Sequence, residues 1–231
     1  TEVVDFTLIT PYGQNRVQLN GSAFGSNGQT FSLILDSLIS IQTPRNVYLW
    51  TQDNGTTVET DSDDANDNVI ANADTRYTFL NFSVNSVVED SQATVYNFSL
   101  QNSTSIVLEW QVEYALEVDS NFQDTASLAT QSDGSLFVEP LDSGASGNPI
   151  PAVGKHWVIE DSPVTLEIDG AIVDLSSHPG LSIRYIPYGY TASGALATQV
   201  GPAANFSLVE ARQQLQEFTM SGPASVTYNW K

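Results

Sequence analysis

Alternation of apolar and polar residues dominates this chain and predicts β-strands. Between Leu108 and Val118 the even positions are apolar, whereas Glu109, Glu113 and Glu117 alternate with them. A period of two places one set of side chains on a buried face and the other set in solvent. The segment from Thr30 to Ile41 repeats this pattern. We expect two long core strands, with buried side chains at Phe31, Leu33, Leu35, Trp110, Val112, Tyr114 and Leu116.

Shorter strand patterns fill most of the remaining chain and are separated by turn residues. Ser26-Asn27-Gly28 predicts one turn, and Asp169-Gly170 predicts a tight hairpin between two strands. The further predicted strands are Val3–Ile9, Val17–Phe24, Val47–Thr51, Tyr77–Val88, Ala93–Leu100, Ser135–Glu139, His156–Glu160, Val164–Ile168, Ala171–Leu175, Leu181–Ile186 and Ser225–Trp230.

One segment carries a helical pattern. Ser207 followed by Glu210 forms a capping box, and apolar residues then recur on one face between Leu208 and Glu217. We therefore predict one short helix near the C-terminal end of the sequence.

These elements predict an all-β fold, namely an antiparallel jelly-roll sandwich. About thirteen strands exceed the eight of a single jelly roll, so the surplus predicts an additional β elaboration. Its predicted boundaries are residues 119–204, which are rich in Gly, Pro and Ser. The whole chain, 1–231, is then one jelly-roll-type chain with an inserted elaboration.

Composition supports a folded chain that is stabilised by burial. Hydrophobic residues make up 41% of the 231 residues, charged residues make up 15%, and there is no cysteine. Disulfides and thiolate metal sites are therefore excluded. No apolar run reaches the about 18 residues that a membrane-spanning helix needs, so we expect no transmembrane segment.

The charge balance is strongly acidic. The chain has 27 Asp and Glu against 7 Lys and Arg, which gives a net charge of −20. Nucleic-acid binding requires clustered cations, so we expect no direct nucleic-acid partner. Excess carboxylate with few lysines favours a protein adapted to concentrated salt, although an ordinary acidic secreted protein also fits.

Candidate catalytic residues are few. Glu109, Glu113 and Glu117 lie roughly 13 Å apart along a strand, too far for a glycosidase carboxyl pair, and are interpreted as a solvated face. Glu167-Ile168-Asp169 resembles the start of a glycosidase motif, but Ala171 replaces its second glutamate.

The two histidines, His156 and His178, have no nucleophile motif beside them. We therefore predict no catalytic, cofactor-binding or metal site, no cofactor, and a chain that is not an enzyme.

Three other features allow a functional interpretation. Acidic residues between Glu59 and Asp67 form either a solvated loop or a calcium site, without the EF-hand glycine and closing glutamate. The tyrosines of Tyr185–Tyr190 fit either the core with a turn or a subunit contact. Six Asn-x-Ser/Thr sequons fit either glycosylation or chance occurrence in a chain rich in Ser and Thr, at Asn20, Asn54, Asn81, Asn97, Asn102 and Asn205.

The cysteine-free, acidic strand pattern, including Phe31–Ile41 and Leu108–Val118, resembles the small major capsid proteins of membrane-containing icosahedral haloarchaeal viruses. The resemblance covers the length, charge and strand pattern of the chain but includes no diagnostic short motif. It implies a vertical single jelly roll, in some members with a β-tower. It also implies that the chain is a capsid subunit of the virion and assembles with itself and with related subunits. Other proteins would bring this subunit close to an internal membrane. No functional residues carry over.

Two other functions fit the same sequence. The sequons favour a glycosylated archaeal cell-surface or filament subunit with a β-sandwich fold, in which a strand is donated to a neighbouring subunit. A carbohydrate-binding sandwich would use exposed Trp50 or Trp157 to stack on sugars, whereas Trp110 is expected on the buried face.

Overall fold

The computed structural model describes residues 2–25, 27–61, 67–89, 93–120, 154–169, 171–174, 182–185, 187–205, 212–214 and 217–230. Strands account for 61% and helices for 9% of the structure. The expected β-rich class is confirmed. Each helix in the described part of the chain is too short to span a lipid bilayer.

The chain divides into two compact units, Thr1–Glu113 and Tyr114–Lys231, which are called unit 1 and unit 2 and described separately. The long strand β11, Thr104–Ser120, contributes residues to both units. The elaboration expected at 119–204 falls within unit 2, and its character as an insertion stays a prediction.

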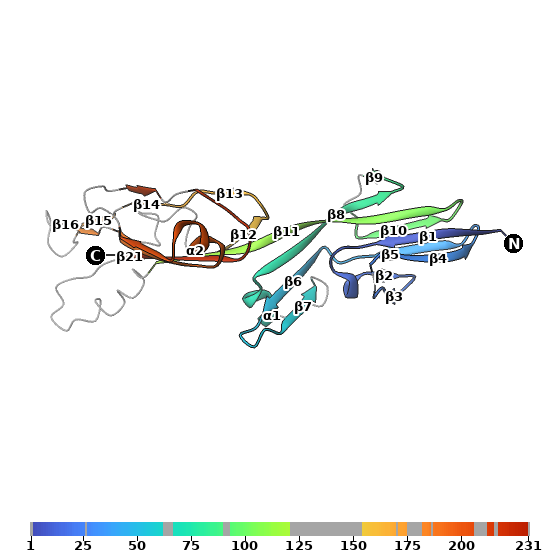
Figure 1. The fold of residues 1–231 in the computed structure, drawn as a ribbon, viewed down its shortest axis with the longest axis horizontal. Helices are drawn as coiled ribbons and strands as arrows, with labels where there is room; N and C mark the ends of the chain where they lie inside the picture. The colour runs from blue at the N-terminus through green and yellow to red at the C-terminus, as the bar shows by residue number, and fades with distance from the viewer. Residues whose placement is uncertain are drawn as a thin grey trace. The chain divides into compact units, whose positions relative to one another are not determined.

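The described residues of unit 1 form mainly strands (Figure 1), and they include two short helices. The helices are η1 (Gln14–Arg16) and α1 (Asp67–Asn72). The strands besides β11 are β1 (Val3–Ile9), β2 (Gln18–Leu19), β3 (Ser22–Ala23), β4 (Gln29–Ile34), β5 (Leu38–Gln42), β6 (Asn46–Thr51), β7 (Thr57–Asp61), β8 (Thr75–Val84), β9 (Val87–Glu89) and β10 (Val95–Ser99).

Two sheets of unit 1 share one apolar core. In the first sheet the pairings run β4–β1–β11–β8, with β6 and β9 also pairing with β8 and β7 pairing with β6. The second sheet has the order β10–β5–β2–β3. Alternate residues of both sheets supply the core, because successive side chains of a strand point to opposite faces. Its buried members include Phe6, Leu8, Ile39, Ile41, Phe79, Phe82, Ile106 and Leu108.

The described residues of unit 2 form the end of β11, one short helix, α2 (Gly194–Val200), and ten further strands. These are β12 (Gly154–Ile159), β13 (Pro163–Val164), β14 (Glu167–Asp169), β15 (Ala171–Asp174), β16 (Ser182–Tyr185), β17 (Pro187–Ser193), β18 (Ala203–Asn205), β19 (Arg212–Gln214), β20 (Phe218–Thr219) and β21 (Ala224–Trp230).

Strand β21 is central to unit 2, because it pairs with β11 on one side and with β17 on the other. Helix α2 begins at Gly194, whose φ is +62°, and a Cβ there would collide with the carbonyl oxygen of Pro223. The buried core includes Leu116, Val118, Leu166, Tyr190, Leu196, Met220, Val226 and Tyr228.

The sheet that contains β11 is mixed, which corrects the antiparallel prediction. Strand β11 pairs in parallel with β1 at Phe6–Ile9 and in parallel with β21 at Ala224–Tyr228. The other pairings for which a register is given are antiparallel, among them β1 with β4 and β5 with β10. Parallel neighbours require long connections, so this order joins segments that are distant in sequence.

The predicted strand Thr30–Ile41 is two strands, β4 and β5, which belong to different sheets. The chain turns at Asp36, whose φ is +67°, and the N–H of Ser37 donates to the carbonyl of Ile34. Asp tolerates this left-handed conformation better than most residues. Because Asp36 also occupies a polar position of the alternation, the sequence pattern did not reveal the turn.

Four further predicted elements differ from the structure. Val17–Phe24 and Tyr77–Val88 were each predicted as one strand, but they contain the antiparallel pairs β2–β3 and β8–β9. Arg212–Gln214, inside the predicted helix Leu208–Glu217, forms β19 and pairs antiparallel with β14; the remaining residues of that segment, except Glu217, lie outside the described residues. The hairpin expected at Asp169-Gly170 does not form, because β14 pairs with β19 while β15 pairs with β16. Pairing of β14 with β19, and of β15 with β16, outweighs the local signals for the helix and for the Asp169-Gly170 hairpin.

Candidate assembly surface

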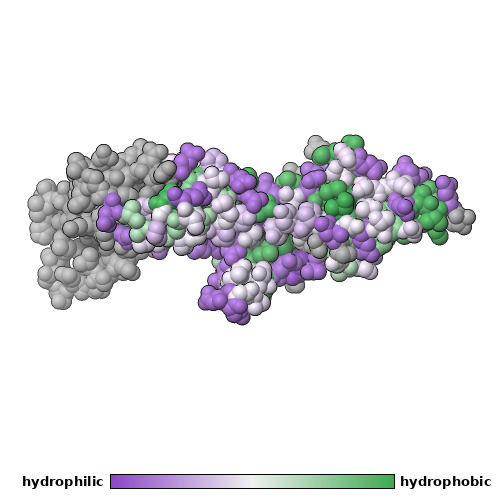
Figure 2. Space-filling view, viewed as in Figure 1, coloured by the Kyte–Doolittle hydropathy of each residue, from purple (hydrophilic) through white to green (hydrophobic). Residues whose placement is uncertain are grey.

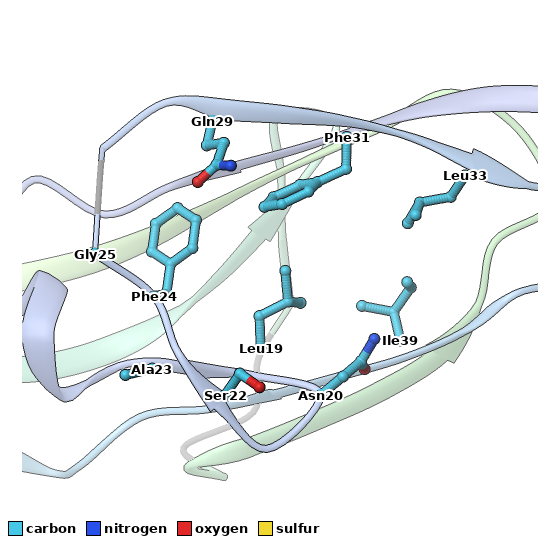
Figure 3. Close-up of a pocket in the computed structure, with 10 residues that line it drawn as sticks. All are labelled: Leu19, Asn20, Ser22, Ala23, Phe24, Gly25, Gln29, Phe31, Leu33 and Ile39. Carbon is cyan, nitrogen blue, oxygen red and sulfur yellow. The ribbon is translucent and has the colours of Figure 1, made fainter.

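An open groove separates the edge of the first sheet from the second sheet in unit 1. Its volume is about 390 Å³. Figure 3 shows Phe24, Phe31, Leu33 and Ile39 pointing into the same space from β4, β5 and the loop after β3. The lining residues are Leu19, Asn20, Ser22, Ala23, Phe24, Gly25, Gln29, Phe31, Leu33 and Ile39, and none of them is charged.

The groove lies beside an unpaired strand edge. Strand β4 pairs with β1, and among the described strands it has no second neighbour. The N–H of Leu35 donates to the carbonyl of Glu2, in register with the β1–β4 ladder. Because hydrogen-bonded positions alternate along an antiparallel ladder, Thr30 and Ser32 direct their backbone groups away from β1.

Apolar side chains are exposed along this edge. Val3 and Ile34 face each other across β1 and β4 and are 57% and 55% exposed, and Leu38 at the start of β5 is 80% exposed. Figure 2 shows apolar surface at the end of unit 1 that carries the N-terminus. An uncharged edge of this kind is unusual, because proteins commonly protect free edges with charges or proline.

A second exposed apolar element is strand β9. It follows a two-residue turn in which Asn85 and Ser86 have φ of +49° and +68°, as a type I′ hairpin requires. Val87 and Val88 are 64% and 60% exposed although successive residues point to opposite faces. The hairpin therefore presents apolar side chains on both of its faces.

The three glutamates of β11 have different environments. Glu109 and Glu117 are exposed, as expected, and Glu117 lies 3.4 Å from the Nζ of Lys155. Glu113 was expected in solvent, but it is buried and receives hydrogen bonds from Arg76 and Thr78. Burial alone would raise the pKa of Glu113, but these hydrogen bonds and the guanidinium charge outweigh it and lower the pKa.

The other predicted core residues of these strands are less buried than alternation suggests. Leu116 is fully buried, whereas Phe31, Leu33, Leu35, Trp110, Val112 and Tyr114 are half-buried. The indole Nε1 of Trp110 donates to the hydroxyl of Thr10 at 3.1 Å. Partial exposure at β4 is explained by the open groove, which no strand of the described chain fills.

The acidic run that suggested calcium is partly neutralised inside unit 1. Arg16 contacts Glu59 at 3.1 Å and Asp61 at 3.3 Å, and its Nη2 donates to the carbonyl of Glu59. The acidic residues between Asp61 and Asp67 lie outside the described residues. Within the described chain no group of three or more His, Asp or Glu side chains could hold a metal ion.

The other residues considered for catalysis or sugar binding lie on separate elements. Glu167 and Asp169 lie on β14, the half-buried His156 lies on β12, and His178 lies outside the described residues. Trp50 and Trp157 are half-buried, and the Nζ of Lys155 lies 6.0 Å from the ring centroid of Trp157.

Tyr190 belongs to the core of unit 2, not to a contact surface. It is 4% exposed, and its hydroxyl donates to the carbonyl of Val200 at 3.1 Å. Burial raises the pKa of its phenol. Of the predicted tyrosine cluster, Tyr185 and Tyr188 have described backbones in β16 and β17 but no described side chains.

Five of the six sequon asparagines are exposed, and Asn81 on β8 is half-buried. Asn54 accepts a hydrogen bond from the N–H of Thr56, and Asn102 contacts the hydroxyl of Thr104. The exposed set is Asn20, Asn54, Asn97, Asn102 and Asn205.

Sequence reasoning did not identify the groove or the hairpin. The available signals were the uncharged run from Gln29 to Leu35 and the adjacent valines Val87 and Val88. Comparisons with protein-family models, curated proteins and solved structures found no match to this chain.

Proposed function

We propose that this chain is a structural subunit of an icosahedral virus capsid shell, which assembles with copies of itself and with related capsid proteins in the virion. The observation that carries the proposal is the uncharged groove beside the free edge of β4, on a chain with a net charge of −20. Edges without protecting charges are suited to pairing with another chain.

The distribution of charge supports an assembly role. Acidic copies repel one another, so stable contacts between them form best where carboxylates are absent. The groove lining meets this condition, and so does the segment Thr78–Val88, which ends directly before Glu89. The jelly-roll arrangement of the sandwich and adaptation to concentrated salt belong to the same proposal, and both rest on the resemblance of the strand and charge pattern.

A second candidate is a glycosylated archaeal cell-surface or filament subunit. The observation that favours it is the exposure of five sequon asparagines. Glycans at these positions add mass to the chain, so the intact mass of protein from its native source distinguishes a glycosylated subunit from the bare 25.0 kDa chain.

Electron microscopy and light scattering of the purified chain test the proposed function. In about 1 M NaCl, where the screening length is roughly 3 Å, we expect the chain to assemble with itself or with its related subunits into closed, spherical particles. Filaments would favour the second candidate. A monodisperse monomer at high concentration, with and without related subunits from its source, would contradict both assembly functions.

A further inference from the structure

We infer that the free edge of β4 binds the β8–β9 hairpin of a second copy of this chain, so that β9 adds to the first sheet of its neighbour. This inference rests on the proposed assembly function and names the partner of the groove. The structure places two elements in the same unit: an acceptor strand without charged residues, and an exposed hairpin whose segment Thr78–Val88 is uncharged, with Glu89 at the end of β9.

The acceptor combines backbone and side-chain features. Thr30 and Ser32 present their backbone groups to the open side of β4, while Phe31 and Leu33 line the adjacent groove. An added strand would satisfy these backbone groups and cover the groove with alternate side chains. This is the usual logic of strand addition, in which main-chain hydrogen bonds supply affinity and pockets supply specificity.

The donor strand β9 exposes apolar side chains on both of its faces. Val87 and Val88 lie on opposite faces of β9, and β9 pairs with β8 only, among the described strands. When β9 lies beside β4, one valine is directed to the groove and the other to the face that carries exposed Ile34. From Thr78 to Val88 the sequence contains no charged residue.

The absence of carboxylates from the groove lining favours a second copy of this chain over a basic protein as the binding partner. A cationic partner would be attracted to the carboxylates, which are absent from the groove lining. A copy of this acidic chain approaches most closely where carboxylates are few. Neither β4 nor the segment Thr78–Val88 contains a charged residue, and the carboxylates next to them are Asp5, which accepts a hydrogen bond from Ser32, and Glu89 at the end of β9.

The position of the two edges favours a contact that repeats from copy to copy. The pairings run β4–β1–β11–β8–β9, so β4 and β9 are the two ends of one series of strands. A head-to-tail contact between different surfaces repeats from copy to copy. The series of copies closes into a ring when the rotation between neighbouring copies allows it, and otherwise extends as an open filament. A two-fold contact of β4 with β4 would instead stop at a dimer.

Cysteine cross-linking separates these arrangements, because the parent chain contains no cysteine. Ser32→Cys on β4 and Val88→Cys on β9 are prepared separately in the full chain and treated with a short bismaleimide under assembly conditions. We expect a cross-linked dimer when the two variants are mixed and none from either variant alone. Thr57→Cys, on the exposed start of β7, is the matched control and should give no dimer with Ser32→Cys.

Each outcome has a defined meaning. A dimer from Ser32→Cys alone would overturn the inference in favour of a two-fold β4 contact. Assemblies that form normally, while the mixture gives no dimer and both variants retain the parent melting temperature, would overturn the inference but leave the assembly function intact. A parent chain that stays monomeric with and without related subunits would overturn the proposed function itself.

Discussion

Arg76 and Glu113 form a bidentate ion pair between neighbouring strands of unit 1. The guanidinium Nε and Nη2 each lie 2.8 Å from a carboxylate oxygen, and the hydroxyl of Thr78 donates to the same carboxylate at 2.6 Å. The Glu113 side chain is 9% exposed. Most of the acceptor capacity of this buried charge is therefore satisfied, as burial of a carboxylate requires.

Removing the carboxylate is predicted to destabilise the chain strongly. Glu113→Gln leaves Arg76 without its counter-charge, and breaking one partner of a buried pair costs about 3 kcal/mol in the free energy of unfolding. Urea denaturation at pH 7 measures this difference. Glu109→Gln, on an exposed position of the same strand, is the matched control and should change stability by less than about 0.5 kcal/mol.

The difference between wild type and Glu113→Gln is also predicted to depend on pH. Because the folded-state pKa of Glu113 lies below its ordinary value of 4.5, its stabilising contribution is complete above 4.5. It is lost as the pH falls through the lowered folded-state pKa. Denaturation curves for both proteins should therefore converge in acid. A difference that stays constant down to pH 2 would show that the carboxylate charge is not its source.

The burial of Glu113 could not be predicted from the sequence pattern. Alternation correctly placed Leu108 and Leu116 inside and Glu109 and Glu117 outside. It placed Glu113 with the other glutamates, because the pattern contains no information about Arg76, which is 37 residues distant. Strand periodicity assigns a face, but the residues that cover that face depend on sheet order.

The same reason explains the groove. Local signals predicted β1, β6, β12 and β21 to within two residues of their boundaries. The groove depends on β4 and β5 belonging to different sheets, and this follows from pairing with β1 and β10. Residues Arg212–Gln214 likewise form a strand through their contact with β14, despite the capping-box signal that precedes them.

Tyr190 gives a prediction that separates a core role from a contact role. Tyr190→Phe keeps the ring and removes the hydroxyl that donates to Val200, so the free energy of unfolding should fall by about 1 kcal/mol. Tyr190→Ser also removes the buried ring and should cost about 3 kcal/mol or more. Urea denaturation measures both values. A serine variant of unchanged stability but impaired assembly would contradict the core role.

Salt should control both folding and assembly of this chain. The net charge of −20 creates repulsion within each copy and between copies. At about 0.1 M salt the screening length is roughly 10 Å, so carboxylates on facing surfaces repel one another, whereas at about 1 M it falls to roughly 3 Å. Lowering NaCl between these values should dissociate assemblies and lower the melting temperature, with divalent cations giving partial rescue.

Light scattering and thermal melting across a NaCl series measure these effects. Sucrose is the control, because it favours compact states by exclusion from the protein surface but does not screen charge. The Arg76 and Glu113 side chains are 22% and 9% exposed, so the contribution of this pair should change less with salt than the repulsion among exposed carboxylates. Assemblies and melting temperatures that respond equally to NaCl and sucrose, or to neither, would contradict adaptation to concentrated salt. That result would also mean that repulsion between carboxylates does not decide whether uncharged edges or acidic surfaces join the copies.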